Sequence, residues 1–163
     1  MKVLKFGGTS VGSVDSIRQI QHIIGQQTDD CIVVVSALGG ITDQLLKAAH
    51  LALEAGEEYM EVYQAIRCRH MDMVNTLITN PTTRQMLCLE LESILDELRS
   101  ILFGVHLVKD LSDKTEAAIV SYGERMSSRI VTAALPGAVH KNSLQFIRTE
   151  HKQGQVLLNT ELT

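Results

Sequence analysis

The sequence predicts an α/β fold that is rich in helices and contains a small, mainly parallel sheet. Two short apolar runs, residues 2–6 and 31–35, each end in a glycine-rich loop that leads into a helical pattern. A strand-loop-helix order that occurs twice is typical of parallel sheets, because consecutive parallel strands need a crossover connection, usually a helix. The middle of the chain adds further helices, since its apolar residues recur every three or four positions.

The composition is that of one ordinary globular domain. The 163 residues are enough to bury a core, and with 45% hydrophobic and 21% charged residues the chain is neither disordered nor fibrous. A net charge of −4 and a pI near 5.8 argue against non-specific binding to nucleic acid or to an anionic membrane. No apolar stretch approaches the roughly 20 residues that a membrane span needs, and the N-terminus lacks the apolar segment of a signal peptide.

Cysteine and histidine usage predicts a reducing compartment and no metal site built by the protein. Cys31, Cys68 and Cys88 are odd in number and have no metal-ligand spacing, so we expect reduced thiols and a cytoplasmic location. The six histidines form no H-x-x-x-H pair of the kind that binds zinc.

The first strand and helix are defined by their ends. Residues 2–6 form an apolar run that a Gly-Gly pair terminates, which is typical of a strand leading into a loop. Ser13 can cap the following helix, with Asp15 in its first turn, and Gly25 is the expected stop.

The second strand, residues 31–35, is continuously apolar and mostly β-branched. Such a run is typical of a strand that is covered on both faces. A glycine-rich loop, residues 36–40, follows it, and a helix then runs from about Thr42 to Ala55, with Gly56 at its C-terminal end. Right-handed crossovers place the two glycine-rich loops side by side at the carboxyl edge of the sheet, where open α/β sheets bind their ligands.

Two long helices are expected in the middle of the chain. The first ends at Asn80-Pro81, and Thr82 with Gln85 can form a capping box for the second, which Gly104 stops. Their apolar residues are spaced by four and three, so we expect two antiparallel helices packed like a short coiled coil. These residues are Tyr59, Tyr63, Ile66, His70, Met73 and Leu77 in the first helix, and Leu87, Leu91, Ile94, Leu98 and Ile101 in the second.

The C-terminal region is predicted to hold a fifth helix and two weaker strands. Asp113 and Glu116 can cap the fifth helix, which runs to about Leu135 before a Pro-Gly pair breaks it. Residues 138–141 and 146–148 are candidates for short strands.

The loop after the first strand, residues 5–10 (KFGGTS), has the residue types of a phosphate site in an unusual order. A Walker loop has its lysine after the glycines, whereas Lys5 precedes Gly7 and Gly8, and the dinucleotide spacing G-x-G-x-x-G is also absent. The glycines let backbone N–H groups approach an anion closely, and Lys5 can add a point charge for phosphates. The same stretch also fits a tight turn with a lysine exposed at the end of the strand.

Two further segments bring polar groups to this edge. The second loop offers Ser36, Gly40 and Thr42, although Thr42 also fits the N-cap of the following helix. Within the fifth helix, Gly123 costs about 1 kcal/mol relative to alanine, which suggests that something packs closely there. Glu124 follows it and can hold an ammonium group if it faces the loops; otherwise it is an ordinary solvated glutamate.

Three motifs in this order resemble one family, the aspartokinases. Residues 5–11 (KFGGTSV) match the family's N-terminal signature, residues 35–43 (VSALGGITD) look like its second loop, and residues 123–127 (GERMS) look like its helical G-E-x-M-S motif. The opening string and the long helical insert look most like the kinase part of bifunctional aspartokinase–homoserine dehydrogenases. The resemblance covers essentially the whole chain.

The resemblance implies a three-layer α/β/α amino-acid kinase fold and transfer of the γ-phosphoryl group of ATP to the β-carboxylate of L-aspartate, the first step of lysine, threonine and methionine biosynthesis. By resemblance, Lys5 steadies the transferring phosphoryl group and Mg²⁺ arrives with the ATP. The implied phosphate- and nucleotide-binding residues are Lys5, Gly7, Gly8, Thr9 and Ser10. The implied aspartate-binding residues are Ser36, Gly40, Thr42 and Glu124, with Glu124 receiving the α-ammonium group.

The family's kinase domain continues beyond residue 163 into a nucleotide-holding part, with regulatory ACT domains after it. We therefore expect residues 1–163 to be the N-terminal, substrate-side part of a larger enzyme, inactive without the rest. We also expect this enzyme to form a homo-oligomer through its helices or through the domains that are missing here. Two function classes stay open, namely part of an aspartate kinase or a non-catalytic binding or assembly module derived from an amino-acid kinase. Lys5, Thr42 and Glu124 together favour the enzyme, because a pure scaffold has no use for this trio.

Overall fold

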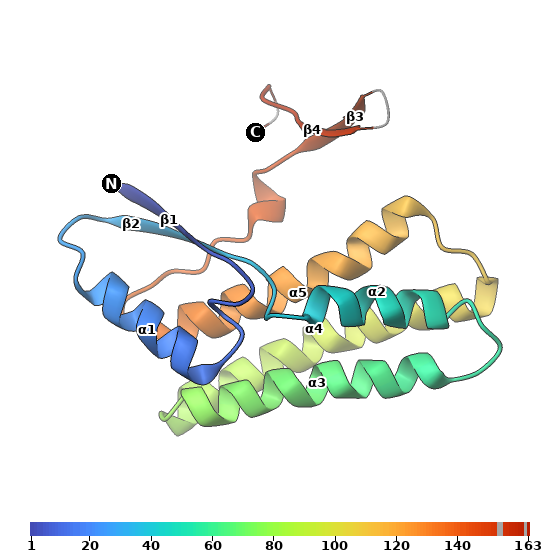
Figure 1. Cartoon of the computed structure of the whole chain (residues 1–163), viewed down its shortest axis with the longest axis horizontal. Coiled ribbons are helices and arrows are strands. Elements are labelled where there is room, and N and C mark those ends of the chain that lie inside the picture. Colours follow the sequence, from blue (N-terminus) through green and yellow to red (C-terminus); the bar gives the residue numbers. More distant parts are fainter. Residues whose placement is uncertain (153–154, 162) are drawn as a thin grey trace.

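The computed structural model describes residues 1–152, 155–161 and 163 (Figure 1). In this part of the chain, five α-helices pack together beside a two-stranded parallel sheet, and a small hairpin near the C-terminus stands apart from them. The helix-rich arrangement with a small parallel sheet confirms the predicted α/β fold class.

The parallel sheet is the expected strand-helix-strand unit. Strand β1 (Lys2–Phe6) pairs in parallel with β2 (Cys31–Val35), and helix α1 (Val14–Gly25) connects them. The Ser13 hydroxyl accepts the N–H of Ser16 at 3.1 Å, which confirms the predicted N-cap, and the helix ends at Gly25 as predicted.

Only one face of this sheet is buried. Phe6, Val33 and Val35 pack against the core, whereas Ile32 and Val34 on the other face are 47% and 45% exposed. The prediction that the second strand is covered on both faces is therefore wrong for the described chain. Its side chains alternate between the two faces with a period of two, and helices pack against one of them only.

Four further helices form a layered bundle in which sequence neighbours pack against each other (Figure 1). They are α2 (Ile41–Leu51), α3 (Glu58–Leu77), α4 (Pro81–Val108) and α5 (Asp113–Ala134). The predicted apolar stripes of α3 and α4 form the core of this bundle. The stripes differ in detail at their C-terminal ends, where Val74 and Leu102 are fully buried while Leu77 and Ile101 are only half-buried.

Helix α2 is shorter than predicted, and Gly56 does not end it. The helix stops at Leu51, and the Lys109 ammonium group donates hydrogen bonds to the carbonyls of Ala52 and Glu54 just beyond. Lys109 comes from the far end of α4, where its left-handed backbone (φ 53°) terminates that helix. A long-range contact that local sequence does not reveal thus holds the chain just beyond the end of α2.

Two predicted caps are one or two residues away from the observed ones. Asn80, not Thr82, caps α4, because its side-chain oxygen accepts the N–H of Thr83 at 3.0 Å and Pro81 occupies the first helical position. Ser112, not Asp113, caps α5, since its hydroxyl accepts the N–H of Thr115. The capping-box prediction is therefore wrong, while Asp113 and Glu116 lie in the first turn of α5, where the helix dipole favours a carboxylate.

The C-terminal strand predictions are wrong in position. Residues 138–141 form no strand, and residues 146–148 follow a single 3₁₀ turn, Ser143–Gln145. Instead, β3 (Thr149–Lys152) and β4 (Gln155–Leu158) form an antiparallel hairpin. None of the helices in the described part of the chain is long and apolar enough to cross a membrane.

Candidate functional site

The two glycine-rich loops lie against each other at the carboxyl ends of β1 and β2, as predicted. A Cβ atom placed on Gly8 would be 3.1 Å from the carbonyl oxygen of Ala37, and one on Gly39 would be 3.2 Å from that of Gly8. Both distances are shorter than ordinary van der Waals contact with backbone, so larger residues would force the loops apart. The glycines are needed for this close backbone approach.

The first loop is a compact turn. The carbonyl of Gly7 accepts the N–H groups of Ser10 and Val11 at 2.9 and 3.2 Å, and Thr9 accepts that of Gly12 at 3.3 Å. Val11 is completely buried and anchors the turn in the core, whereas Thr9 and Ser10 are exposed. The turn therefore presents its polar residues to solvent from a fixed base.

Several backbone N–H groups in the two loops have no hydrogen-bond partner in the part of the chain that the structure describes. Those of Gly8, Thr9, Gly39 and Gly40 donate no hydrogen bond to an acceptor within the described residues. Unpaired N–H groups on two loops in contact have the donor chemistry of an anion site. This is the chemistry that the sequence predicted for the first loop.

Lys5 lies beside this cluster of donors. It is exposed, pairs with Val34 in the sheet register, and its ammonium nitrogen is 3.9 Å from the position of a Cβ on Gly7. Strand β1 ends at the next residue, so the strand itself places the charge at the mouth of the first loop.

Helix α5 is fastened to the second loop by the residues around Gly123. A Cβ on Gly123 would lie 2.6 Å from the Cβ of Ala37, which confirms that something packs closely at this glycine. The Glu124 carboxylate accepts the N–H of Ala37 at 3.2 Å, and the Ser127 hydroxyl donates to the carbonyl of Ser36 at 2.7 Å. The exposed Glu124 side chain thus faces the loops and retains an oxygen that accepts nothing from the described residues.

The remaining predicted residues of the second loop lie at the start of α2. Gly40 is the N-cap of α2 in a left-handed conformation (φ 80°), so the alternative interpretation of Thr42 as that cap is wrong. Thr42 instead lies in the first turn of the helix and, like Ser36, is half-buried. The roles of all these residues in binding stay predictions.

Arg69 is a residue of the site that the sequence did not single out. We would expect a surface arginine from its position on α3, but its guanidinium group lies at both loops. Its Nη2 donates to the carbonyl of Gly12 at 3.5 Å, and its Nη1 is 3.8 Å from the position of a Cβ on Gly40. No local signal reveals this placement, because it depends on how α3 packs against α1 and α2.

The neighbour of Arg69 on α3 carries no charge near neutral pH. His70 is fully buried, and burial together with the nearby guanidinium lowers its pKa to about 4, although its hydrogen bond to the carbonyl of Ile66 acts in the opposite direction. Among the described residues, Lys5 and Arg69 thus bring positive charge to the two loops, and His70 does not.

Comparison with known proteins identifies the family of this chain. A sequence model of the Amino acid kinase family matches residues 1–161. The chain belongs to the amino acid kinase family. Aspartokinase 2, chloroplastic, of Arabidopsis thaliana is 32% identical over 143 residues, which cover 85% of this chain and 25% of that protein. The bifunctional aspartokinase/homoserine dehydrogenase of Buchnera aphidicola is 30% identical over 141 residues, covering 83% of this chain and 17% of the relative.

Solved aspartokinase structures share the fold of this amino acid kinase chain. Escherichia coli aspartokinase III in complex with lysine and aspartate superposes with a TM-score of 0.70 at 28% identity, covering 82% of this chain and 28% of that one. The same enzyme in complex with aspartate and ADP gives 0.69 at 27% identity, with the same coverage. The chain thus spans about a quarter of the length of these aspartokinases. The bifunctional relatives are 22–30% identical and the monofunctional ones 30–32%, so these matches do not favour the bifunctional kind, which stays a prediction.

Proposed function

We propose that the chain forms the substrate-side part of an aspartate kinase catalytic domain. The reaction is transfer of the γ-phosphoryl group of ATP to the β-carboxylate of L-aspartate, giving 4-phospho-L-aspartate. The observation that carries the proposal is the position of Glu124, whose carboxylate accepts the N–H of Ala37 in the second loop at 3.2 Å, while that loop lies against the first loop at Gly8. A substrate with both an ammonium group and anionic groups fits such a set of opposite charges.

The donors of the first loop and Lys5 would hold the phosphoryl group. Gly7, Gly8, Thr9 and Ser10 form a turn in which the N–H groups of Gly8 and Thr9, without an acceptor among the described residues, can donate hydrogen bonds to an anion, and Lys5 adds a cation at the strand end. Phosphoryl transfer needs little covalent chemistry from the protein, because positioning and charge neutralisation supply most of the catalysis. Mg²⁺ enters as part of the Mg-ATP substrate.

The second loop and α5 would hold aspartate. Glu124 would receive the α-ammonium group on the carboxylate oxygen to which no described residue donates a hydrogen bond, while Ser36, Gly40 and Thr42 line the same edge. Both solved structures described above are complexes with aspartate, and one of them also contains ADP. This supports aspartate and ATP as the two substrates.

The test is calorimetric titration of the chain with L-aspartate. Glu124→Gln keeps an oxygen that can accept the N–H of Ala37 but removes the charge, so we expect aspartate binding to weaken about ten- to a hundred-fold, the usual effect of losing a charge-assisted hydrogen bond. Mg-ATP binding should change much less. Glu116→Gln is the matched control, because Glu116 lies on the same helix and pairs with His50 instead.

If Glu124→Gln lowered the affinity for aspartate and for Mg-ATP equally, this carboxylate would have a structural role. No binding of aspartate by the unmodified chain would contradict the proposal itself. A cytoplasmic location and assembly into a homo-oligomer accompany the proposal as predictions; the plant relatives carry chloroplastic names.

A further inference from the structure

Arginines on the helices of this protein pair with glutamates of α4 in three cases. Arg67 pairs with Glu92, and the pairs Arg125–Glu97 and Arg129–Glu90 join α5 to α4. Arg69 differs from these three, because no carboxylate of the described residues lies within ion-pair distance of its guanidinium group. A half-buried guanidinium group without an anionic partner among the described residues is available to an anion, which suggests that one completes this position.

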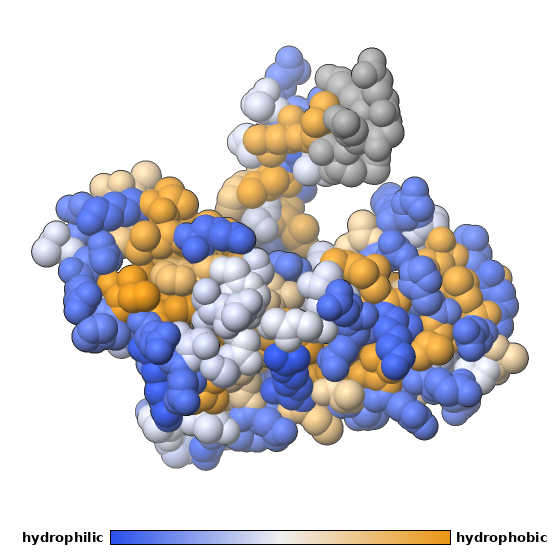
Figure 2. Space-filling model, in the orientation of Figure 1, coloured by the Kyte–Doolittle hydropathy of each residue, from blue (hydrophilic) through white to orange (hydrophobic). Residues whose placement is uncertain are grey.

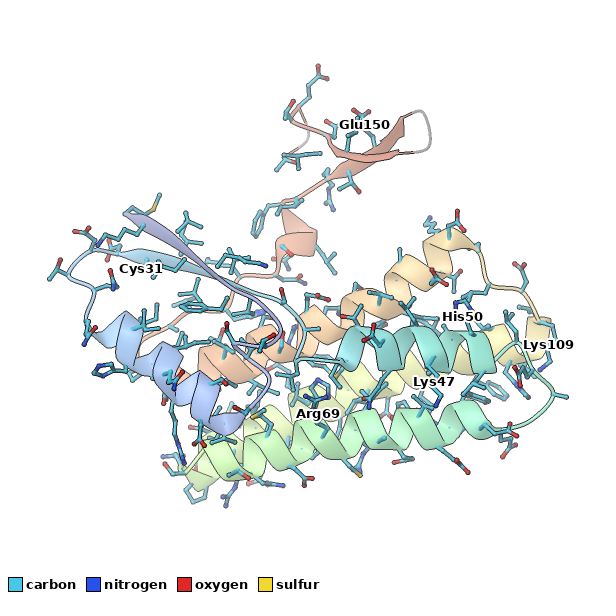
Figure 3. The ribbon with its side chains drawn as sticks, in the orientation of Figure 1. Cys31, Lys47, His50, Arg69, Lys109 and Glu150 are labelled. Carbon is cyan, nitrogen blue, oxygen red and sulfur yellow. The ribbon has the colours of Figure 1, made fainter. Side chains whose placement is uncertain are left out.

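The location of Arg69 identifies where that anion would bind. The guanidinium group reaches from α3 to Gly12, which follows the first loop and donates its N–H to Thr9 of that loop, and to Gly40 at the start of α2. Figure 3 shows Arg69 between α3 and the beginning of α2, on the side of the loops. The residue therefore contributes a positive charge to the edge where both loops have unpaired N–H groups.

A purely structural role accounts for little of this arrangement. The bond to the Gly12 carbonyl is 3.5 Å long, at the outer limit for a hydrogen bond, and it uses one of the five N–H donors of the guanidinium group. The other donors form no hydrogen bond with the described residues, so they are available to a planar oxyanion, which arginine binds in a bidentate manner.

We propose that Arg69 is a substrate-binding residue that takes an oxyanion of the substrate, a carboxylate or a phosphate, between the two glycine-rich loops. This inference rests on the proposed function. It adds a ligand from α3, which none of the three sequence motifs contains.

The experiment measures binding of L-aspartate and of Mg-ATP by calorimetry in the 163-residue chain, with circular dichroism as a check on folding. We expect Arg69→Gln to weaken the binding of one of the two ligands about ten- to a hundred-fold, and Arg69→Lys to recover part of the lost affinity. Loss of aspartate binding would identify a carboxylate as the anion, and loss of Mg-ATP binding a phosphate. Arg67→Gln is the matched control, since it removes a charge two residues away on the same helix, and it should change neither affinity more than about two-fold.

Unchanged binding of both ligands by Arg69→Gln would overturn the inference while leaving the proposed function intact. Equal losses in Arg69→Gln and Arg67→Gln would also overturn it, because the effect would then belong to the helix and not to the site. Unfolding of both Arg69→Gln and Arg69→Lys would show that Arg69 is required for folding and would reject a role in ligand binding. If the unmodified chain binds neither ligand, the proposed function fails and this inference fails with it.

Discussion

Gly123 lies where α5 comes closest to the loop after β2, and its missing side chain is what permits the contact. The sequence revealed this position through one local anomaly, a glycine in a helix interior. The motifs around Lys5, Thr42 and Glu124 were equally visible, because each combines unusual residue types within a few positions. Arg69 could not be found in this way, since nothing within α3 distinguishes it from the surface arginines of the chain.

We expect Gly123→Ala to destabilise the protein by about 1 kcal/mol. Helix propensity alone favours alanine by about 1 kcal/mol, but the new Cβ would lie 2.6 Å from that of Ala37, and overpacking of this kind costs about 1–3 kcal/mol. The overlap should outweigh the propensity. The measurement is the free energy of unfolding from urea denaturation.

Gly104→Ala provides the opposite control. Gly104 lies inside α4, which continues past it to Val108 and so contradicts its predicted role as a helix stop. Apart from the backbone of α4 itself, no described heavy atom lies within 4 Å of a Cβ placed there, so alanine should stabilise the protein by up to about 1 kcal/mol. If both substitutions stabilised the protein equally, close packing at Gly123 would not be what requires the glycine.

At the scale of the elements, periodicity predicted the helices well and local signals predicted their ends poorly. The three- and four-residue spacing of apolar residues correctly predicted α3, α4 and most of their buried residues. Such a prediction works because burial of one face contributes most of the stability of a helix in a folded protein. Ends depend on single hydrogen bonds that several neighbouring polar residues can make. The segment just after α2 is held by Lys109, more than 50 residues away along the chain, and no window of local sequence contains this contact (Figure 3).

The cap of α4 can be tested directly, since sequence and structure assign it to different residues. Asn80→Ala should lower the free energy of unfolding by about 1 kcal/mol, because the N–H of Thr83 then loses its acceptor. Thr82→Ala should change it by less than about 0.5 kcal/mol, because exposed substitutions away from a cap have small effects. Urea denaturation of both variants decides between them, and the reverse order of effects would restore the capping-box prediction.

At the scale of the whole molecule, the sheet is the least covered part of the fold. Strand β2 was predicted to be buried on both faces because its residues are uniformly apolar, and composition alone cannot tell which face a helix will reach. In the described chain, Val3 is 64% exposed beside Ile32 and Val34 on the open face. Figure 2 shows hydrophobic side chains gathered at this end of the molecule. An apolar patch of this kind is typical of a surface that another protein surface covers.

We predict that the chain associates with itself through this open face. The double substitution Ile32→Thr/Val34→Thr keeps β-branched side chains suited to a strand but makes the face polar, so it should shift the protein toward monomer with little change in the free energy of unfolding. Val33→Thr is the control on the opposite face. Val33 packs against the core, so a hydroxyl there should cost about 1 kcal/mol and leave self-association unchanged. Sedimentation velocity at increasing protein concentration measures the association. A wild-type chain that stays monomeric over this range, or a double variant that associates as strongly as wild type, would show that the open face does not mediate self-association.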